Sequence, residues 1–333
     1  MSRMTRRTFS RTVLTSLFVA ASPSAFAQAS SPSGSPVTLR IGYQKSSTLI
    51  TLLKTNGSLE KALAPLNVHI SWNEFASGLP LTEALNADAV DFSADVADTV
   101  PIFAQAAHAR FAYVAQEAPS PRAQAILVRR DSPIHTSHDL KGKRIAVTKA
   151  AGSHYLLLAA LAQVQLKASD VHISYLTPAD GRAAFERGSV DAWVTWDPYV
   201  ASVDRDANVR ILADGTALAS YQRYYLASLT FANAHPQIIQ TLFEQLKSAG
   251  EWLLAHQQQA ANLLAPVWGL DASTIARANA RRSYLVRAVT AQHFGEQQTI
   301  ADTFFDNGLL PAKIDTKEAL SWDFQAKSAK PVG

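Results

Sequence analysis

The turn Gly152-Ser153-His154 is a candidate for binding an anion. It follows a predicted strand and opens a predicted apolar helix, so backbone N–H groups and the positive end of the helix dipole are available there. Gly152 would permit close approach of a ligand, and Ser153 would add a hydroxyl donor. Ser153 could instead cap its own helix, and these residues alone do not separate the two interpretations.

Further candidate donors follow the ends of other predicted strands. Gln44 offers an amide donor to an anion, and Lys45 either reaches the anion or lies in solvent, as most lysines do. Gly78 and Thr99 lie at similar turns, whose backbone N–H groups could also bind an anion.

Trp196 follows a predicted strand and is expected to cover the apolar part of a ligand; ordinary core packing is the alternative. Trp193 fits core packing better, because it lies on the opposite face of that strand. The carboxylates of Asp98, Glu117 and Asp197 would repel an anion unless a cation or donor intervenes. They are expected to orient donors, to receive an ammonium group, or to serve in helix caps and lobe contacts.

The motifs of common enzyme classes are missing from the sequence. Ser153 and His154 are adjacent, which is poor geometry for a nucleophile and its base, and no Gly-x-Ser-x-Gly or His-Glu-x-x-His motif occurs. The chain has no cysteine, which excludes disulfides, thiolate metal sites and iron–sulfur clusters. We expect a binding protein with no catalytic residue, no metal and no cofactor.

The first 27 residues are predicted to be a cleaved signal peptide. A basic start leads into the apolar run Val13–Ala21 and then into Ala25-Phe26-Ala27, a small-x-small cleavage pattern. The apolar run is shorter than the ~20 residues that span a bilayer. Thr5–Arg11 resembles a twin-arginine export signal. Without a cysteine for a lipid anchor, the exported chain is expected in a periplasm, cleaved near Ala27.

The positive charge of the chain belongs to this leader. The formal net charge is +4, and the leader contains four arginines and no carboxylate, so the remainder is formally neutral. The exported part therefore has no net positive field to attract nucleic acid or a membrane surface, and we expect neither partner.

The rest of the chain alternates predicted strands and helices, which indicates βαβ units and mainly parallel sheets. The predicted strands are Thr38–Tyr43, His69–Phe75, Val90–Ser93, Phe111–Ala118, Ile126–Arg129, Arg144–Thr148, Val171–Leu176, Ala192–Thr195, Arg210–Leu212 and Tyr224–Leu229. The predicted helices include Ser47–Lys54, Thr99–Ala107, Tyr155–Val164 and Pro178–Arg187, and nearly all of the chain from His235 onward.

We expect an α/β fold of two lobes that close on a ligand about a hinge. The first lobe would comprise residues 37–124 and 222–320, and the second residues 125–221. A flexible lead-in, 28–36, would precede them, and a tail, 321–333, would follow.

Several segments in order along the chain carry a resemblance to a known family. They are Leu39–Lys45, Trp72–Phe75, Gly78, Glu83–Leu85, Pro101–Ala107, Asp139–Lys143, Tyr175–Phe185, Val190–Trp193 and Trp196–Tyr199. Through them the sequence resembles the aliphatic-sulfonate-binding proteins of ATP-driven (ABC) importers, within the wider group that includes taurine- and nitrate-binding proteins.

The resemblance implies the two-lobe fold of type II periplasmic binding proteins. It further implies a small sulfonate as ligand, a membrane permease as transient partner, and a monomer. It favours Gly152 and Ser153 as the anion site. Taurine, nitrate and a pyrimidine vitamin precursor remain open as alternative ligands.

Overall fold

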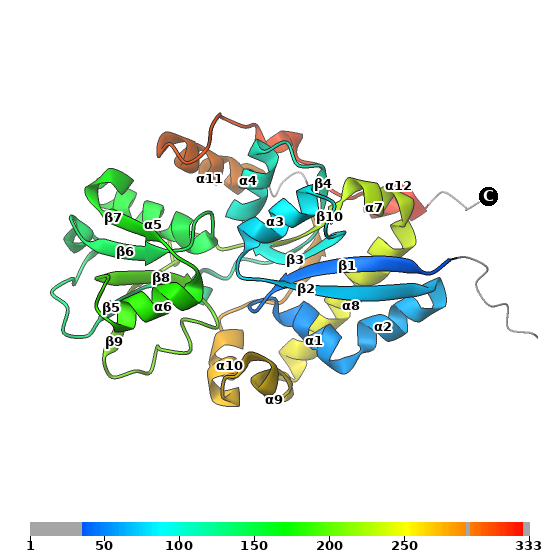
Figure 1. Ribbon diagram of the computed structural model, residues 1–333, viewed down its shortest axis with the longest axis horizontal. Coiled ribbons are helices and arrows are strands. Elements are labelled where there is room, and N and C mark those ends of the chain that lie inside the picture. The colour runs from blue at the N-terminus through cyan, green and yellow to red at the C-terminus, as the bar shows by residue number, and fades with distance from the viewer. Residues whose placement is uncertain (1–34, 291–293, 329–333) are drawn as a thin grey trace, which may run out of the picture. The chain divides into compact units, whose positions relative to one another are not determined.

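Two mixed β-sheets form the framework of the protein (Figure 1). The structure, a computed structural model, describes residues 35–290 and 294–328. The first sheet has six strands in the order β11-β4-β10-β3-β1-β2. Its strands are β1 (Val37–Gln44), β2 (Val68–Phe75), β3 (Phe92–Ala97), β4 (Phe111–Glu117), β10 (Arg223–Ser228) and β11 (Val286–Ala288).

The second sheet has five strands in the order β7-β6-β8-β5-β9. Its strands are β5 (Gln124–Arg129), β6 (Arg144–Val147), β7 (His172–Tyr175), β8 (Ala192–Trp196) and β9 (Val209–Asp214). In each sheet a parallel group, β1–β2–β3 or β6–β7–β8, is extended by antiparallel strands. Each sheet with the helices packed on it is called a lobe below.

Helices cover both faces of each sheet. They are α1 (Thr48–Asn56), α2 (Ser58–Leu63), α3 (Gly78–Asn86), α4 (Thr99–Ala106), α5 (Gly152–Gln163), α6 (Pro178–Glu186), α7 (Leu229–Ala234), α8 (Pro236–Ala255), α9 (Gln257–Trp268), α10 (Ala272–Asn279), α11 (Phe294–Asp306) and α12 (Phe324–Ser328). None of the described helices combines the length and the apolar character needed to cross a membrane.

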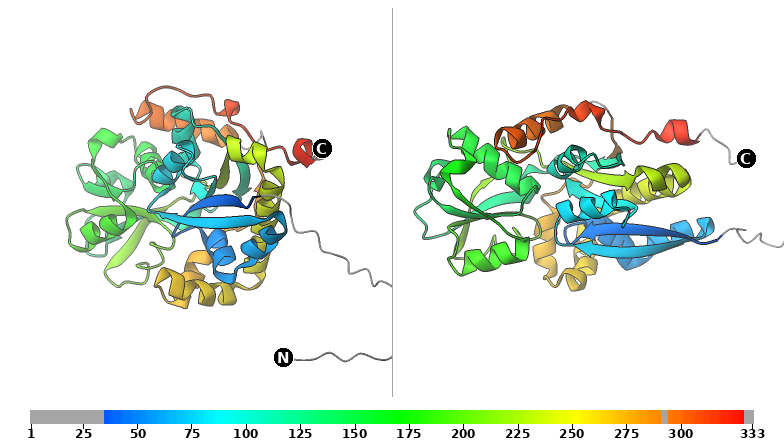
Figure 2. Two further views of the ribbon diagram at one scale, coloured as in Figure 1. Left: turned by 45° about the vertical axis from the view of Figure 1, so that its right-hand side comes forward. Right: turned by 45° about the horizontal axis from the view of Figure 1, so that its top comes forward.

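Four apolar cores hold these layers together. In the first lobe, α1, α2 and α8 pack on one face of the sheet, and α3 and α4 pack on the other. In the second lobe, α5 and α6 lie on opposite faces (Figure 1). Because α5 is apolar around much of its circumference, it can also contact α11, which packs across α4 as well (Figure 2). The helix α11 therefore contacts both lobes.

The chain passes between the lobes twice, once from β4 to β5 and once from β9 to β10. These two crossing segments, residues 118–123 and 215–222, are hydrogen-bonded to each other. The N–H of Ser120 donates to the carbonyl of Ser220 (2.9 Å), and the N–H of Gly215 donates to the carbonyl of Pro121 (3.0 Å). Short, paired crossings of this kind allow lobes to rotate with little change elsewhere.

The two-lobe α/β architecture predicted from the sequence is confirmed, and the differences have local causes. The sheets are mixed rather than mainly parallel. The third strand lies at Phe92–Ala97, not Val90–Ser93, because Asp95 is buried within it and paired with arginines from distant segments. The strand β11 interrupts a region predicted to be nearly all helix, since it pairs at an edge with β4.

Several predicted boundaries also moved. Helix α5 begins at Gly152 rather than Tyr155, and β8 ends at Trp196 rather than Thr195. The segment predicted to be a tail contains α12, whose Phe324 packs against Phe243. The predicted signal peptide, residues 1–27, lies outside the described part of the chain, as do residues 28–34 of the lead-in.

Candidate functional site

A small cavity lies between the two lobes, at the ends of the strands and the beginnings of the helices. Its volume is about 10 Å³, enough for roughly one water molecule. We call it the central cavity. It is lined by Gln44, Ser46, Gly78, Ala97 and Val100 of the first lobe, by Ala151, Gly152 and Trp196 of the second, and by Tyr221 and Arg223 at the second crossing.

Four of the residues predicted to bind ligand meet at this cavity. Gln44 is the last residue of β1, and Trp196 is the last residue of β8. Gly78 and Gly152 are the first residues of α3 and α5. Neither helix has a side-chain cap on its first turn, so the positive ends of two helix dipoles, one from each lobe, face the cavity.

Both glycines leave room for neighbouring side chains at the cavity, and Gly152 does so for a residue of the opposite lobe. A Cβ atom at Gly152 would lie 2.5 Å from the ring of Tyr221 and 3.2 Å from the Cβ of Ala97 in the other lobe. A Cβ at Gly78 would lie 2.7 Å from a methyl group of Val100. Only glycine therefore fits at position 152 when the lobes are this close, and only glycine fits at position 78 beside Val100 of its own lobe.

Trp196 is buried on the cavity side of the second sheet. It lies opposite Gln124 in the β5–β8 register and packs edge-on against Tyr199, with ring centroids 5.9 Å apart. As predicted, Trp193 lies on the other face, where it packs against Phe185 under α6. The two tryptophans of this strand therefore have different surroundings, and of the two Trp196 lines the cavity.

Ser153 and His154 are fully buried behind the turn and do not line the cavity. The Oγ atom of Ser153 makes no hydrogen bond with the described residues. His154 accepts a hydrogen bond at Nδ1 from the N–H of Ala150 (3.3 Å), and its ring packs edge-on against Phe304. Burial lowers the pKa of His154 to about 4, with a further contribution from Lys149, so the ring is neutral at pH 7.

Asp98 and Thr99 connect the first lobe to the second crossing and to the second lobe. The carboxylate of Asp98 caps α4 by accepting from the N–H of Thr99 (3.0 Å), and it also accepts from the N–H of Gln222 on the second crossing (2.9 Å). Burial raises the pKa of Asp98 to about 7, although these two N–H donors oppose the shift. The hydroxyl of Thr99 donates to the carbonyl of Ala150 in the second lobe (2.5 Å).

Asp197 takes part in an ion-pair cluster between the lobes. Nη1 of Arg281, which follows α10, donates to both carboxylate oxygens of Asp197, at 3.0 and 3.2 Å. Arg281 also pairs with Asp204, which Arg277 contacts at 3.2 Å. Burial raises the pKa of Asp197 to about 7, and Arg281 opposes that shift. Asp197 is thus a lobe contact and does not line the cavity.

Glu117 has partners of its own and does not line the cavity. It accepts from Nη2 of Arg282 (2.6 Å) and from the hydroxyl of Tyr225 (2.7 Å). Lys45 also lies elsewhere, in a separate cavity of about 70 Å³ beside Lys54 and Trp268. The structure therefore does not bring Lys45 or the three predicted carboxylates into the central cavity.

The sequence analysis did not single out the other residues that line this cavity. Tyr221 and Arg223 come from the second crossing and the first residue of β10, just before the predicted strand Tyr224–Leu229. A weak signal was present, because an arginine opens an otherwise uncharged strand, Arg223–Ser228. Ser46 and the small residues Ala97 and Ala151 carried no signal that distinguishes them from ordinary loop or core residues.

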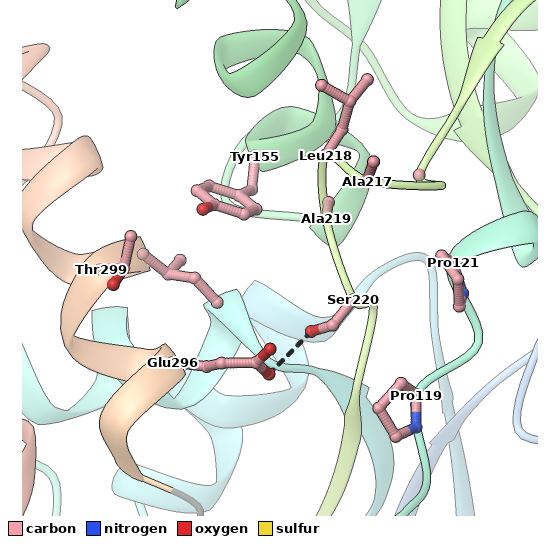
Figure 3. A pocket seen from close by; sticks show the side chains of 11 residues that line it. Pro119, Pro121, Tyr155, Ala217, Leu218, Ala219, Ser220, Glu296 and Thr299 are labelled. Atoms are coloured by element: carbon pink, nitrogen blue, oxygen red, sulfur yellow. Dashed lines mark hydrogen bonds between the residues drawn. The ribbon is translucent and has the colours of Figure 1, made fainter.

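A larger cavity, of about 500 Å³, is lined by residues of both crossing segments, of α5 and of α11 (Figure 3). Pro119, Tyr155, Ser220 and Glu296 are among its lining residues. Figure 3 shows Ser220 and Glu296 pointing toward one another, and the hydroxyl of Ser220 donates to the Glu296 carboxylate (3.0 Å). This cavity contains a carboxylate and none of the predicted ligand-binding residues, so its chemistry does not suit an anion.

The chain is similar in sequence and structure to known binding proteins. A relative from Escherichia coli (strain K12), named as an aliphatic sulfonates-binding protein, is 42% identical over 287 residues, covering 86% of this chain and 89% of the relative. A relative of the same name from Bacillus subtilis (strain 168) is 32% identical and covers 87% of each chain.

The alkanesulfonate-binding protein SsuA from Xanthomonas axonopodis pv. citri, solved bound to MOPS, superposes with a TM-score of 0.82 at 38% identity, over 87% of this chain and 99% of that one. The NMT1/THI5-like family model matches residues 66–260. The family resemblance stated from the sequence motifs is therefore confirmed: the chain belongs to the NMT1/THI5-like family and, within it, to the family of the aliphatic-sulfonate-binding proteins.

Proposed function

We propose that this protein captures aliphatic sulfonates between its two lobes and delivers them to the permease of an ABC importer. The observation that carries the proposal is the composition of the central cavity. Two uncapped helix N-termini, at Gly78 and Gly152, face it, together with donors from Gln44 and Ser46. Among the described residues, no carboxylate lines this cavity.

This arrangement suits the chemistry of a sulfonate group. A sulfonate is ionised at neutral pH and has three acceptor oxygens, so it requires several convergent donors and no proton acceptor. Free helix N-termini supply backbone N–H groups and about half a positive charge each. Val100 and Trp196 supply an apolar wall for the carbon chain.

A sulfonate does not fit a cavity of about 10 Å³, so the lobes must separate to admit it. The proposed moving units are the two lobes predicted from the sequence, residues 37–124 with 222–320 and residues 125–221. The paired crossing segments would act as the hinge. Ligand would then bridge Gln44 and Gly78 on one side and Gly152 and Trp196 on the other.

The proposed place of action is the periplasm, where the protein would act as a monomer after removal of residues 1–27, by the twin-arginine route or the general secretory route. We expect protein recovered from the periplasm to begin near Gln28, because Ala25-Phe26-Ala27 fits the cleavage pattern. N-terminal sequencing of that fraction measures this. A first residue of Met1, or recovery only with membranes, would contradict the proposal of export and cleavage.

Linear alkanesulfonates and MOPS are expected to raise the melting temperature in a thermal-shift panel, because a ligand that binds only the folded state stabilises it. The same panel includes taurine, nitrate and sulfate, which we expect to bind more weakly than hexanesulfonate. Unchanged melting with every sulfonate, or a larger shift with nitrate, would contradict the proposed ligand class. Recovery of unaltered hexanesulfonate after incubation would support binding without chemistry.

Ser153 does not line the closed cavity, but it directly follows Gly152 in the first turn of α5, so opening of the lobes would bring its hydroxyl within reach of a sulfonate bound there. The Ser153→Ala substitution is therefore expected to weaken sulfonate binding by ~1.5–3 kcal/mol, the usual contribution of one hydrogen bond to a charged group. The buried Ser153 hydroxyl makes no hydrogen bond with the described residues, so the substitution should leave the melting temperature of the ligand-free protein nearly unchanged. Calorimetry of both proteins with hexanesulfonate tests this. Equal affinities would exclude Ser153 from the sulfonate site.

A further inference from the structure

Arg223 has a special position at the central cavity. Of the described residues that line it, Arg223 is the one charged side chain. The side chain is only 2% exposed. Removing a guanidinium from water carries a large cost unless it is paired and hydrogen-bonded, so its partners indicate what the position requires.

The partners of Arg223 leave part of its donor capacity unused. Nη2 pairs with Asp95, and Nη1 donates to the hydroxyl of Tyr221 (2.9 Å). Nη2 also lies 3.4 Å from the hydroxyl of Ser46. The Nε–H group makes no hydrogen bond with the described residues. Because Tyr221 and Ser46 line the same cavity, these contacts hold the guanidinium at its wall.

The charges behind Arg223 are balanced. Arg282 pairs with both Asp95 (3.0 Å) and Glu117 (2.6 Å), so two arginines face two carboxylates. Neither carboxylate lines the cavity, whereas Arg223 does. The positive end of a formally neutral network is therefore turned toward the cavity, and two helix N-termini add about one positive charge in total. Such a site suits a single negative charge.

We propose that Arg223 binds the charged group of the ligand, that Asp95 positions Arg223, and that the site takes monoanions with an apolar body. The inference deepens the proposed function and rests on it. If the Arg223–Asp95 pair served only to join β10 to β3, the Nε–H group would have no role, and the affinity for charged and uncharged ligands would respond alike to its loss.

The test compares 1-hexanesulfonate with uncharged 1-hexanesulfonamide by titration calorimetry. We expect Arg223→Gln to weaken hexanesulfonate by about 10- to 100-fold, the loss of one charge-assisted hydrogen bond, and to leave the affinity for hexanesulfonamide within about threefold. Asp95→Asn should also weaken hexanesulfonate and leave hexanesulfonamide within about threefold, because the guanidinium of Arg223 loses the partner that holds it at the cavity wall. Arg40→Gln breaks another arginine–aspartate pair, with Asp91, that does not line the cavity, and should change neither affinity.

If Arg223→Gln does not fold, the double variant Asp95→Asn/Arg223→Gln removes both charges together, and it should show the same selective loss of hexanesulfonate affinity. Binding of hexanesulfonate to the wild type with unchanged affinity in the Arg223 variants would overturn this inference and leave the proposed function standing. Equal losses for both probes, or unchanged hexanesulfonate binding by Asp95→Asn, would also overturn it. No binding of any sulfonate to the wild type would overturn both proposals.

Discussion

Replacing Arg281 by alanine is expected to destabilise the protein by about 3 kcal/mol at pH 8 and by much less at pH 5. Arg281 is the cation paired with the buried carboxylate of Asp197. Breaking one side of a buried ion pair leaves an uncompensated charge, which accounts for the size of the effect. The expected loss is at the lower end of the usual range because the Arg281 side chain is 18% exposed.

The dependence on pH follows from Asp197. Burial raises its pKa to about 7 from the usual 3.8. Between these values the folded state binds the proton more tightly than the unfolded chain, so the contribution of Asp197 to the free energy of unfolding falls as the pH rises. Arg281 opposes the rise in pKa, so its loss raises the pKa further and extends that fall to higher pH.

Urea unfolding of wild type and Arg281→Ala at pH 5 and pH 8 measures the effect. The double variant Asp197→Asn/Arg281→Ala is the matched control, because it removes the buried carboxylate and should abolish the extra dependence on pH. Asp204 retains Arg277 as a partner in all of these proteins. An equal loss for Arg281→Ala at the two pH values would show that the ionisation of Asp197 is not coupled to Arg281.

The Trp196→Ala substitution is expected to lower the free energy of unfolding by about 3–5 kcal/mol, as for other buried aromatic side chains. It should also change the dependence of affinity on ligand length. In the wild type, each added methylene that is buried under the indole contributes up to ~0.8 kcal/mol, until the chain outgrows the space. Without the indole, this trend from propane- to octanesulfonate should become nearly flat.

Trp193→Ala provides a control of nearly equal burial on the opposite face of the same strand, at 1% exposure against 4% for Trp196. It should cost a similar stability and preserve the chain-length trend, because Trp193 packs under α6 away from the cavity. Calorimetry with the sulfonate series, at a temperature where both variants remain folded, gives the comparison. A trend that survives in Trp196→Ala would place the carbon chain elsewhere.

The sequence predicted the fold best at β1 and β2, in which apolar and polar residues alternate along most of the strand. The boundaries of β1 and β2 were predicted to within one residue at each end. The displacement of β3 came from Asp95, whose presence resembles a loop until its distant partners Arg223 and Arg282 are known. Edge strand β11 has only three residues and depends on pairing with β4.

In the candidate site, too, residues whose roles follow from the local sequence were predicted, and residues whose roles depend on distant partners were not. Gln44, Gly78 and Gly152 were predictable because the ends of parallel strands and the starts of helices lie at one edge of a sheet. The roles of the acidic residues were not, because Asp197 and Arg281 are 84 positions apart in the chain. Arg223 required knowledge of where the second crossing passes, which no local pattern encodes.

Two consecutive residues, Arg281 and Arg282, have partners in different lobes. Arg281 contacts Asp197 and Asp204 beyond β8, whereas Arg282 donates to the carbonyl of Ser46 (2.7 Å) and the hydroxyl of Thr48 (3.0 Å) after β1. The contacts of these two adjacent residues therefore connect the 197–204 segment of the second lobe with Ser46 and Thr48 of the first. We therefore expect that a displacement of the 197–204 segment also shifts Ser46, which lines the cavity, so that residues far apart in the chain move together.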